Sequence, residues 1–254
     1  MTILATEDRS VRTADGATLL DSVSLSVDRG ETVVVAGPSG SGKTTLTKAV
    51  GGLLENRSNL QTTGTVSRPD DVGYLFQNPA TQLVRRTVRH DVAFGLENQG
   101  VPREEIVRRI DTWAERLDAT RFLDREVERL SRGETAVVAL LGSLVTEPDL
   151  VVLDEPLAPL DRRNRRLVLE AIDTLQDHGT TLLVTEHDLR DVLGLADRIV
   201  VLEAGTVVAR GGPADHLDRL RRLGIALPFA TEVALERGRP KTAIPLATGP
   251  EARR

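Results

Sequence analysis

The chain has 254 residues, of which 40% are hydrophobic and only 2% aromatic, and its formal net charge is −5. This length predicts one large domain or two small ones with an aliphatic core, and the negative charge argues against a dedicated nucleic-acid binder. Because the chain has no cysteine, a disulfide framework and a cysteine-based metal site are excluded. No apolar run approaches the ~18 residues that a membrane-spanning helix needs, and the first residues lack the basic and apolar regions of a signal peptide.

Apolar patterns divide the chain into elements that follow one another in α/β order. A turn is predicted at Asp15-Gly16, and the last predicted strands form a hairpin around Glu203-Ala204-Gly205. From Gly238 onward the Pro-, Gly- and Arg-rich sequence predicts a loose tail. Strands are predicted at 19–27, 32–36, 150–153, 181–184, 198–202 and 206–209, and helices from 45 onward and at 102–117, 134–145 and 161–176.

A glycine-rich segment between the strand at 32–36 and the following helix predicts a phosphate-binding loop. Glycines allow backbone N–H groups to surround phosphates, and the helix N-terminus adds partial positive charge. Lys43 can reach the outer phosphates, and the Thr44 hydroxyl can ligate Mg²⁺. The strand–loop–helix context favours this Walker A interpretation over a flexible Gly/Ser loop. The predicted nucleotide-binding residues are Gly37, Pro38, Ser39, Gly40, Ser41, Gly42, Lys43, Thr44 and Thr45.

Two acids follow the apolar run at 150–153. In a parallel sheet of this type the carboxyl ends of the strands converge on the nucleotide. Asp154 would then bind Mg²⁺, directly or through water, and Glu155 would accept a proton from an attacking water. An isolated acidic pair after a strand is more often a helix cap, but its combination with a Walker A segment favours the functional interpretation.

The sequence Leu130-Ser131-Arg132-Gly133-Glu134 precedes an apolar helix. Its simplest interpretation is a capping box, in which Ser131 caps the helix and Glu134 reaches back. A second interpretation is an anion site at the helix N-terminus, directed at a phosphate. The two interpretations are compatible.

The order of these motifs, followed along the chain with Gln77, Leu160-Asp161 and His187, resembles that of ATP-binding-cassette (ABC) ATPases from about Leu4 to about Leu217. The resemblance implies an α/β P-loop NTPase fold with a RecA-like core, an antiparallel β subdomain and an inserted helical subdomain. The ABC domain would cover residues 4–220, with the helical subdomain at about 78–145. A C-terminal extension would follow at 221–254.

The resemblance also implies roles for single residues. Gln77 would contact Mg²⁺ and water and sense the transport partner. The metal would be surrounded by Thr44, Gln77 and Asp154. The catalytic residues would be Glu155, Gln77 and His187. Ser131 and Gly133 would contact the γ-phosphate of the ATP bound by an opposing subunit. Asp161 would lie at the dimer interface, and His187 would contact the γ-phosphate.

A narrower resemblance links the segments at 76–84, 87–98, 101–106 and 223–238 to ATPase subunits of energy-coupling-factor transporters. These importers take up vitamins or transition-metal ions. The resemblance implies a second ABC subunit, in a homodimer or heterodimer, a polytopic membrane coupling protein and a substrate-binding membrane protein, with no nucleic-acid partner. The chain would lie at the cytoplasmic face of the membrane, and residues 78–82, with the short helix that follows them, would dock on the coupling protein.

Several positions depart from the family pattern. Arg132 replaces the first glycine of the Leu-Ser-Gly-Gly-Gln signature, Glu134 replaces its glutamine, and Val137 replaces an arginine. An acid at 134 would lie near the phosphate of the partner's ATP, and we expect Arg132 to offset its charge. Outside the signature, the departures are Thr13 in place of an adenine-stacking aromatic residue, Ala80 in the docking segment, and Leu157-Ala158-Pro159 before Leu160.

These departures leave more than one function open. In a dimer, each ATP site would combine the Walker motifs of one subunit with the signature of the other. The site that uses this chain's intact Walker motifs would be sound, and the site that uses its changed signature would be weaker. This pattern suits a heterodimer or a diverged homodimer. The leading interpretation is a transporter ATPase. The alternative is a soluble or regulatory ABC ATPase with weak hydrolysis, which the changed signature favours and the retained Glu155 and His187 oppose. A cassette protein that acts on ribosomes or DNA would usually need a second cassette or a long coiled-coil insertion.

Overall fold

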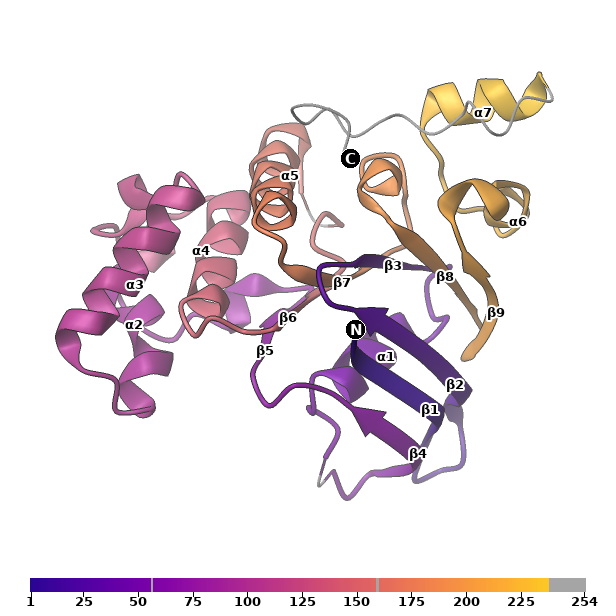
Figure 1. The fold of residues 1–254 in the computed structure, drawn as a ribbon, viewed down its shortest axis with the longest axis horizontal. Coiled ribbons are helices and arrows are strands. Elements are labelled where there is room, and N and C mark those ends of the chain that lie inside the picture. Colours follow the sequence, from indigo (N-terminus) through magenta and orange to yellow (C-terminus); the bar gives the residue numbers. More distant parts are fainter. Residues whose placement is uncertain (56, 159, 238–254) are drawn as a thin grey trace. The chain divides into compact units, whose positions relative to one another are not determined.

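The computed structural model describes residues 1–55, 57–158 and 160–237. The loose tail predicted from Gly238 lies outside the described residues. The chain forms two compact units, one built from Met1–Pro69 together with the described residues from Thr181 onward, and the other from Asp70–Thr180. Figure 1 shows the elements of both units.

An antiparallel sheet in the first unit is formed by β1 (Thr2–Thr13), β2 (Thr18–Asp28) and β4 (Leu60–Ser67), with β1 in the middle (Figure 1). The strand predicted at 19–27 is confirmed as β2, and Gly16 forms the predicted turn with a φ of 91°. The strands β1 and β4 were not predicted from the sequence. Polar residues dominate β4, and hydrogen bonding to β1 rather than an apolar pattern holds it in the sheet.

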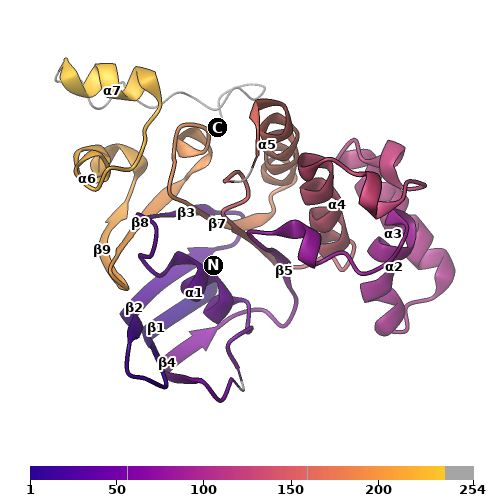
Figure 2. The same cartoon turned by 180° about the vertical axis from the view of Figure 1, so that it is seen from behind.

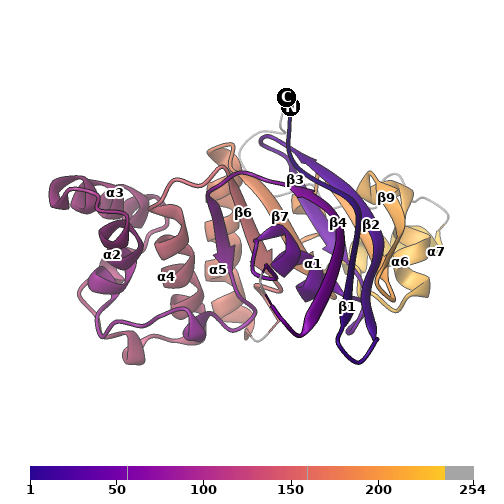
Figure 3. The ribbon, with the colours of Figure 1, turned by 90° about the horizontal axis from the view of Figure 1, so that it is seen from below.

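Buried strands and one helix form the rest of this unit's core. The strand β3 (Thr32–Ala36) pairs in parallel with both β7 (Thr181–Glu186) and β8 (Arg198–Glu203), and β8 pairs antiparallel with β9 (Thr206–Gly211). Every residue of β3 and β7 is buried, as the β-branched apolar runs predicted. The helix α1 (Lys43–Val50) contacts β1, β2 and β7, and Figure 3 shows it between the antiparallel sheet and the parallel strands.

The second unit combines a parallel strand pair with helices. The strands are β5 (Val72–Leu75) and β6 (Leu150–Asp154). The helices are α2 (Val88–Asn98), α3 (Arg103–Arg116), α4 (Arg132–Leu144) and α5 (Arg162–Asp177). The predicted helices at 102–117, 134–145 and 161–176 are confirmed. The helix α4 contacts α2, α3 and α5 and lies between α5 and the α2–α3 pair (Figure 2).

The C-terminal segment of the first unit returns to the end of β7. It contains α6 (Leu217–Arg222) and α7 (Phe229–Glu236). Between these helices the Ala226 carbonyl accepts a hydrogen bond from the Leu189 N–H over 2.8 Å, and Ala226 also forms a parallel bridge with Asp188. The extension is therefore attached to the residues that directly follow His187. No helix in the described part of the chain is long and apolar enough to cross a membrane.

The α/β fold class is confirmed, with an antiparallel sheet, parallel strands and a group of helices. The domain boundaries at 4–220, about 78–145 and 221–254 stay predictions.

Candidate nucleotide-binding and hydrolysis site

The glycine-rich loop has a backbone that only glycine adopts easily. Gly40 and Gly42 have φ angles of +79° and +103°, in the left-handed region that side chains disfavour. A Cβ at Gly37 would lie 2.3 Å from the Leu202 carbonyl oxygen, and one at Gly42 would lie 2.7 Å from the Leu19 carbonyl oxygen. These glycines therefore allow the loop to fold tightly against the neighbouring backbone.

Lys43 and Ser41 present polar groups inside this loop. Lys43 is the first residue of α1 and is buried, and its Nζ donates to the carbonyl oxygens of Gly37 over 2.8 Å and Pro38 over 3.1 Å. Among the described residues, the buried Ser41 Oγ has no hydrogen-bond partner. A buried hydroxyl of this kind needs a partner, and a phosphate oxygen held by the loop would supply one. The loop therefore fits a nucleotide phosphate.

The switch histidine predicted from the sequence follows a strand adjacent to this loop. Ala36, the last residue of β3, pairs in register with Glu186, the last residue of β7. The phosphate loop begins one residue after Ala36, and His187 comes one residue after Glu186. His187 and the glycine-rich loop thus leave neighbouring strand ends of the same unit.

The acidic pair lies at the end of β6 in the second unit. Asp154 and Glu155 are only 1% and 8% exposed. Glu155 has a φ of 49°, a left-handed conformation that costs a residue with a side chain about 1–3 kcal/mol and is concentrated at functional sites. Its Oε2 accepts a hydrogen bond from Gln77 Nε2 over 3.0 Å. Two of the predicted catalytic residues are therefore in direct contact, and neither acid caps a helix.

A second glutamine holds the segment that carries Gln77. The Gln82 side chain accepts from the Phe76 N–H and donates to the Tyr74 carbonyl, each over 2.8 Å. This amide closes the loop that follows β5 against its own strand, so Gln77 lies on a fixed backbone. From the sequence, Gln82 is predicted only as part of the docking segment, and its spacing gives no sign of this role.

The signature sequence forms the predicted capping box at the start of α4. Ser131 Oγ accepts from the Glu134 N–H over 3.3 Å, and Glu134 Oε2 accepts from the Ser131 N–H over 2.7 Å. The other carboxylate oxygen of Glu134 accepts from Arg125 Nη1 over 3.0 Å. Burial raises the pKa of Glu134, but hydrogen bonds from Ser131 and Arg125 outweigh it and hold that pKa below its usual value. The expectation that Arg132 offsets the acid is wrong, because Arg125 supplies the cation.

Asn164 joins the signature sequence to Asp161. Asp161 is the N-cap of α5, and its carboxylate accepts from the Asn164 N–H over 2.9 Å and from Asn164 Nδ2 over 3.0 Å. Ser131 Oγ donates to Asn164 Oδ1 over 3.0 Å. A Cβ at Gly133 would lie 2.7 Å from Asn164 Cβ, so a glycine is needed there. The structure thus brings Ser131, Gly133 and Asp161 together through a residue that the sequence analysis missed.

The predicted site residues fall into two groups, one in each compact unit. The glycine-rich loop, Thr44, Thr45 and His187 belong to the first unit. Gln77, Asp154 and Glu155 belong to the second, as do Ser131, Gly133 and Asp161.

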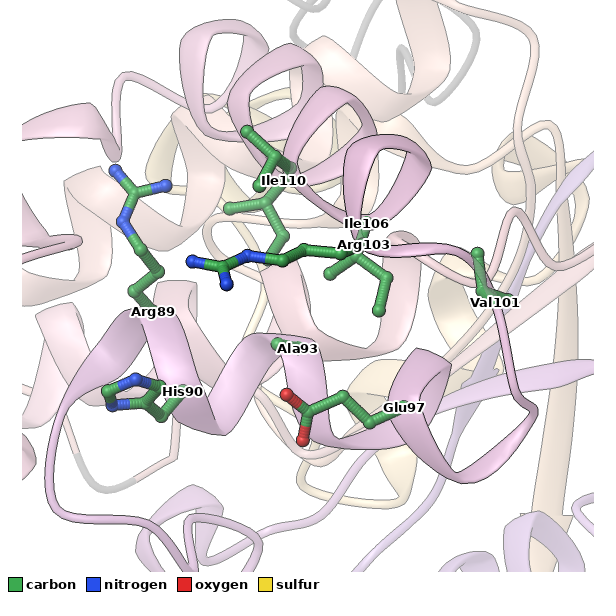
Figure 4. Close-up of a pocket in the computed structure, with 9 residues that line it drawn as sticks. Arg89, His90, Ala93, Glu97, Val101, Arg103, Ile106 and Ile110 are labelled. Carbon is green, nitrogen blue, oxygen red and sulfur yellow. The ribbon is translucent and has the colours of Figure 1, made fainter.

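A separate groove lies between α2 and α3, with a volume of about 490 Å³ (Figure 4). Ala93, Ile106 and Ile110 give it an apolar floor, and polar side chains of α2 and α3 stand around it. At its edge Arg89 forms an ion pair with Asp111 over 3.1 Å. The groove contains none of the predicted nucleotide-site residues.

Comparisons with known proteins give one consistent result. A model of the ABC transporter family matches residues 20–158. The energy-coupling factor transporter ATP-binding protein EcfA1 of Halalkalibacterium halodurans is 39% identical over 234 residues, which cover 87% of this chain and 84% of that protein. A putative ABC transporter ATP-binding protein of Halobacterium salinarum is 45% identical over 219 residues, which cover 82% and 93%. The solved structure of CbiO1 from Clostridium perfringens, described as part of the ABC transporter complex CbiONQ, has a TM-score of 0.77 at 27% identity and covers 96% of this chain and 99% of that one.

Proposed function

Because the chain belongs to the family of ABC transporter ATP-binding proteins, we propose that it is the ATP-binding and ATP-hydrolysing subunit of an energy-coupling-factor importer that takes up a vitamin or a transition-metal ion. The proposed ATP hydrolysis rests on the hydrogen bond between Gln77 and Glu155, whose backbone is strained. The alternative, a soluble or regulatory ATPase, is not favoured, because the curated relatives are named as transporter ATP-binding proteins.

ATP would be bound by the glycine-rich loop and the N-terminus of α1. Backbone N–H groups of the loop, the Ser41 hydroxyl and the Lys43 ammonium would contact the phosphates. In the described residues, no group of three or more His, Asp or Glu side chains could hold a metal ion. From the motif order, the residues that would hold a Mg²⁺ ion together with phosphate oxygens are Thr44, Gln77 and Asp154, and the ion would neutralise charge that develops on the phosphates.

Hydrolysis needs a base for the attacking water. The Glu155 carboxylate would accept a proton from that water, while the Gln77 amide donates to one carboxylate oxygen and so fixes the direction of the other. His187 would contact the γ-phosphate from the neighbouring strand end, and Lys43 would stabilise the charge on the same group.

The signature residues would act on a second ABC subunit. Ser131 and Gly133, at the N-terminus of α4, would contact the γ-phosphate bound by the partner, and Asp161 would lie at the interface. The partner would be a second copy of this chain or a related subunit. Because Arg125 binds the Glu134 carboxylate, the changed signature is compatible with an anionic ligand at this helix end.

The membrane components would dock on the segment that follows Gln77. Within it, Val84 is an apolar side chain that is 65% exposed, next to the segment at 78–82. A polytopic coupling protein that carries a substrate-binding membrane protein would contact this surface, which would place the chain at the cytoplasmic face of the membrane.

Reconstitution tests this function. The full-length chain should restore ATP-dependent uptake to vesicles that contain a coupling protein and a substrate-binding membrane protein of this importer class. Lys43→Ala should abolish uptake by weakening ATP binding, since it removes the phosphate-facing charge. Equal uptake with Lys43→Ala and with the wild-type chain would overturn the proposal.

A further inference from the structure

The side-chain amide of Asn164 has a defined orientation between two motifs. Asp161 is a carboxylate that can only accept, so the Asn164 NH₂ group faces it, over 3.0 Å. The amide oxygen then faces the Ser131 hydroxyl, which donates to it over 3.0 Å. Reversing the amide would place an oxygen against the Asp161 carboxylate and break that contact. The hydrogen-bonded series Asp161–Asn164–Ser131 therefore has one amide orientation in which both hydrogen bonds of the Asn164 side chain form.

We propose that Asn164 is a positioning residue that holds the Ser131 hydroxyl for the phosphate of the partner's nucleotide and links it to Asp161. The inference rests on the proposed function, in which Ser131 binds that phosphate. Asn164 itself acts only through Ser131. Neither the family comparisons nor the motif assignments give position 164 a role.

The bonding of the Ser131 hydroxyl explains how this works. Its oxygen accepts the N–H of Glu134, which fixes the side chain as a helix cap, while its single proton is held by Asn164. When an anionic phosphate oxygen approaches, only that proton has to turn from Asn164 Oδ1 to the phosphate. A neutral hydrogen bond is then exchanged for a stronger charge-assisted one. Asn164 thus keeps the hydroxyl in place and releases its proton easily.

Contact with Gly133 adds a second constraint. Asn164 packs against this glycine so closely that a Cβ there would lie 2.8 Å from Asn164 Cα. The N-terminal turns of α4 and α5 therefore approach each other at this pair of residues. A displacement of Asp161 at the dimer interface would be transmitted to Ser131 through one side chain.

A double-mutant cycle tests the inference on the full-length chain, alone or with the second cassette of its transporter, whichever supports wild-type turnover. Asn164→Ala should lower kcat/KM for ATP about three- to tenfold, the cost of ordering one side chain on binding, because Ser131 is then no longer held in place before the phosphate arrives. In a Ser131→Ala background it should have no further effect, because its role passes through Ser131. Arg166→Ala is the matched control, since this exposed residue of α5 pairs with Glu170 on the same helix, and it should leave turnover unchanged. If the separate effects of the two substitutions on kcat/KM multiply in the double variant, the inference is overturned.

Asn164→Asp separates positioning from a merely structural role. The carboxylate can still accept from Ser131, but it repels Asp161 until one of the two acids binds a proton. Its activity relative to wild type should therefore rise between pH 8 and pH 5.5, while the ratio for Asn164→Ala stays flat. A flat ratio for both variants would also overturn the inference. Absence of turnover in the wild type, with and without a second cassette, would instead overturn the proposed function.

Discussion

Gln77 Nε2 lies 3.0 Å from Glu155 Oε2 and donates a hydrogen bond to it, although the two residues follow different strands and are 78 positions apart in the chain. The Gln77 amide therefore holds one oxygen of the Glu155 carboxylate, the group proposed to accept a proton from the attacking water. Because Gln77 also directly precedes the segment proposed to meet the membrane partner, movement of that segment would directly affect Glu155, the proposed catalytic base. This contact gives the predicted coupling between transport and hydrolysis a physical path.

Removing the Gln77 amide should impair catalysis more than binding. Gln77→Ala should lower kcat about three- to tenfold, because Glu155 loses the donor that orients it, while ATP affinity changes less than twofold. Steady-state ATPase kinetics and nucleotide titration would measure the two effects. Gln82→Ala is a useful contrast, since it removes two backbone contacts and should lower the melting temperature as well. An unchanged kcat for Gln77→Ala would show that the hydrogen bond has no role in the reaction.

The charge balance of the signature sequence should depend on Arg125. Arg125→Ala leaves the Glu134 carboxylate uncompensated beside the proposed phosphate site, so we expect ATPase activity to fall about fivefold, the size of one partly exposed charge contact. Adding Glu134→Gln should restore it, because glutamine can still accept the Ser131 N–H. Arg132→Gly should change little. If Glu134→Gln restores the activity of an Arg132 variant but not that of Arg125→Ala, the Arg125–Glu134 ion pair is not the compensating contact.

The exposed Val84, which follows the docking segment at 78–82, should matter only when the membrane proteins are present. Val84→Asp should reduce ATP-dependent uptake at least tenfold and leave the ATPase activity of the isolated chain within twofold. Val107→Asp is the matched control, because Val107 is also exposed but lies on α3, and it should retain uptake. Normal uptake with Val84→Asp would remove Val84 from the proposed interface.

The C-terminal extension should stabilise the region around His187. Leu227, directly after the residue that bonds Leu189, is 3% exposed, whereas Phe229 is 83% exposed. Leu227→Ala should cost about 2–5 kcal/mol of unfolding free energy and lower ATPase activity, while Phe229→Ala should do neither. Thermal denaturation and ATPase assays would measure both. Equal stability of the two variants would contradict the packing that the structure shows.

Sequence patterns predicted the parts of this protein that are fixed by local chemistry. The buried strands at 32–36 and 150–153 and the capping box at Ser131 follow from apolar runs and spacing, and the structure confirms them. The strands β1 and β4 were missed because long-range hydrogen bonding rather than their own apolar pattern places them.

Contacts between side chains of different elements were not predictable from spacing. Asn164 is a polar residue in the first turn of a charged helix, and only the packing of α5 against α4 shows that it meets Ser131. Arg125 lies in an irregular segment, so neighbouring Arg132 was the natural choice as partner of Glu134. In both cases the sequence indicated the motif, and the tertiary structure selected the partner.

The central claim is that this chain hydrolyses ATP with Glu155 as the base, and a comparison of Glu155→Gln with the wild type tests it most directly. Glutamine has nearly the same shape but cannot accept the proton of the attacking water. ATPase turnover should fall at least a hundredfold, the typical contribution of general base catalysis, while ATP affinity is retained and an ATP-bound dimer accumulates in gel filtration. Wild-type turnover in the Glu155→Gln variant would contradict the account.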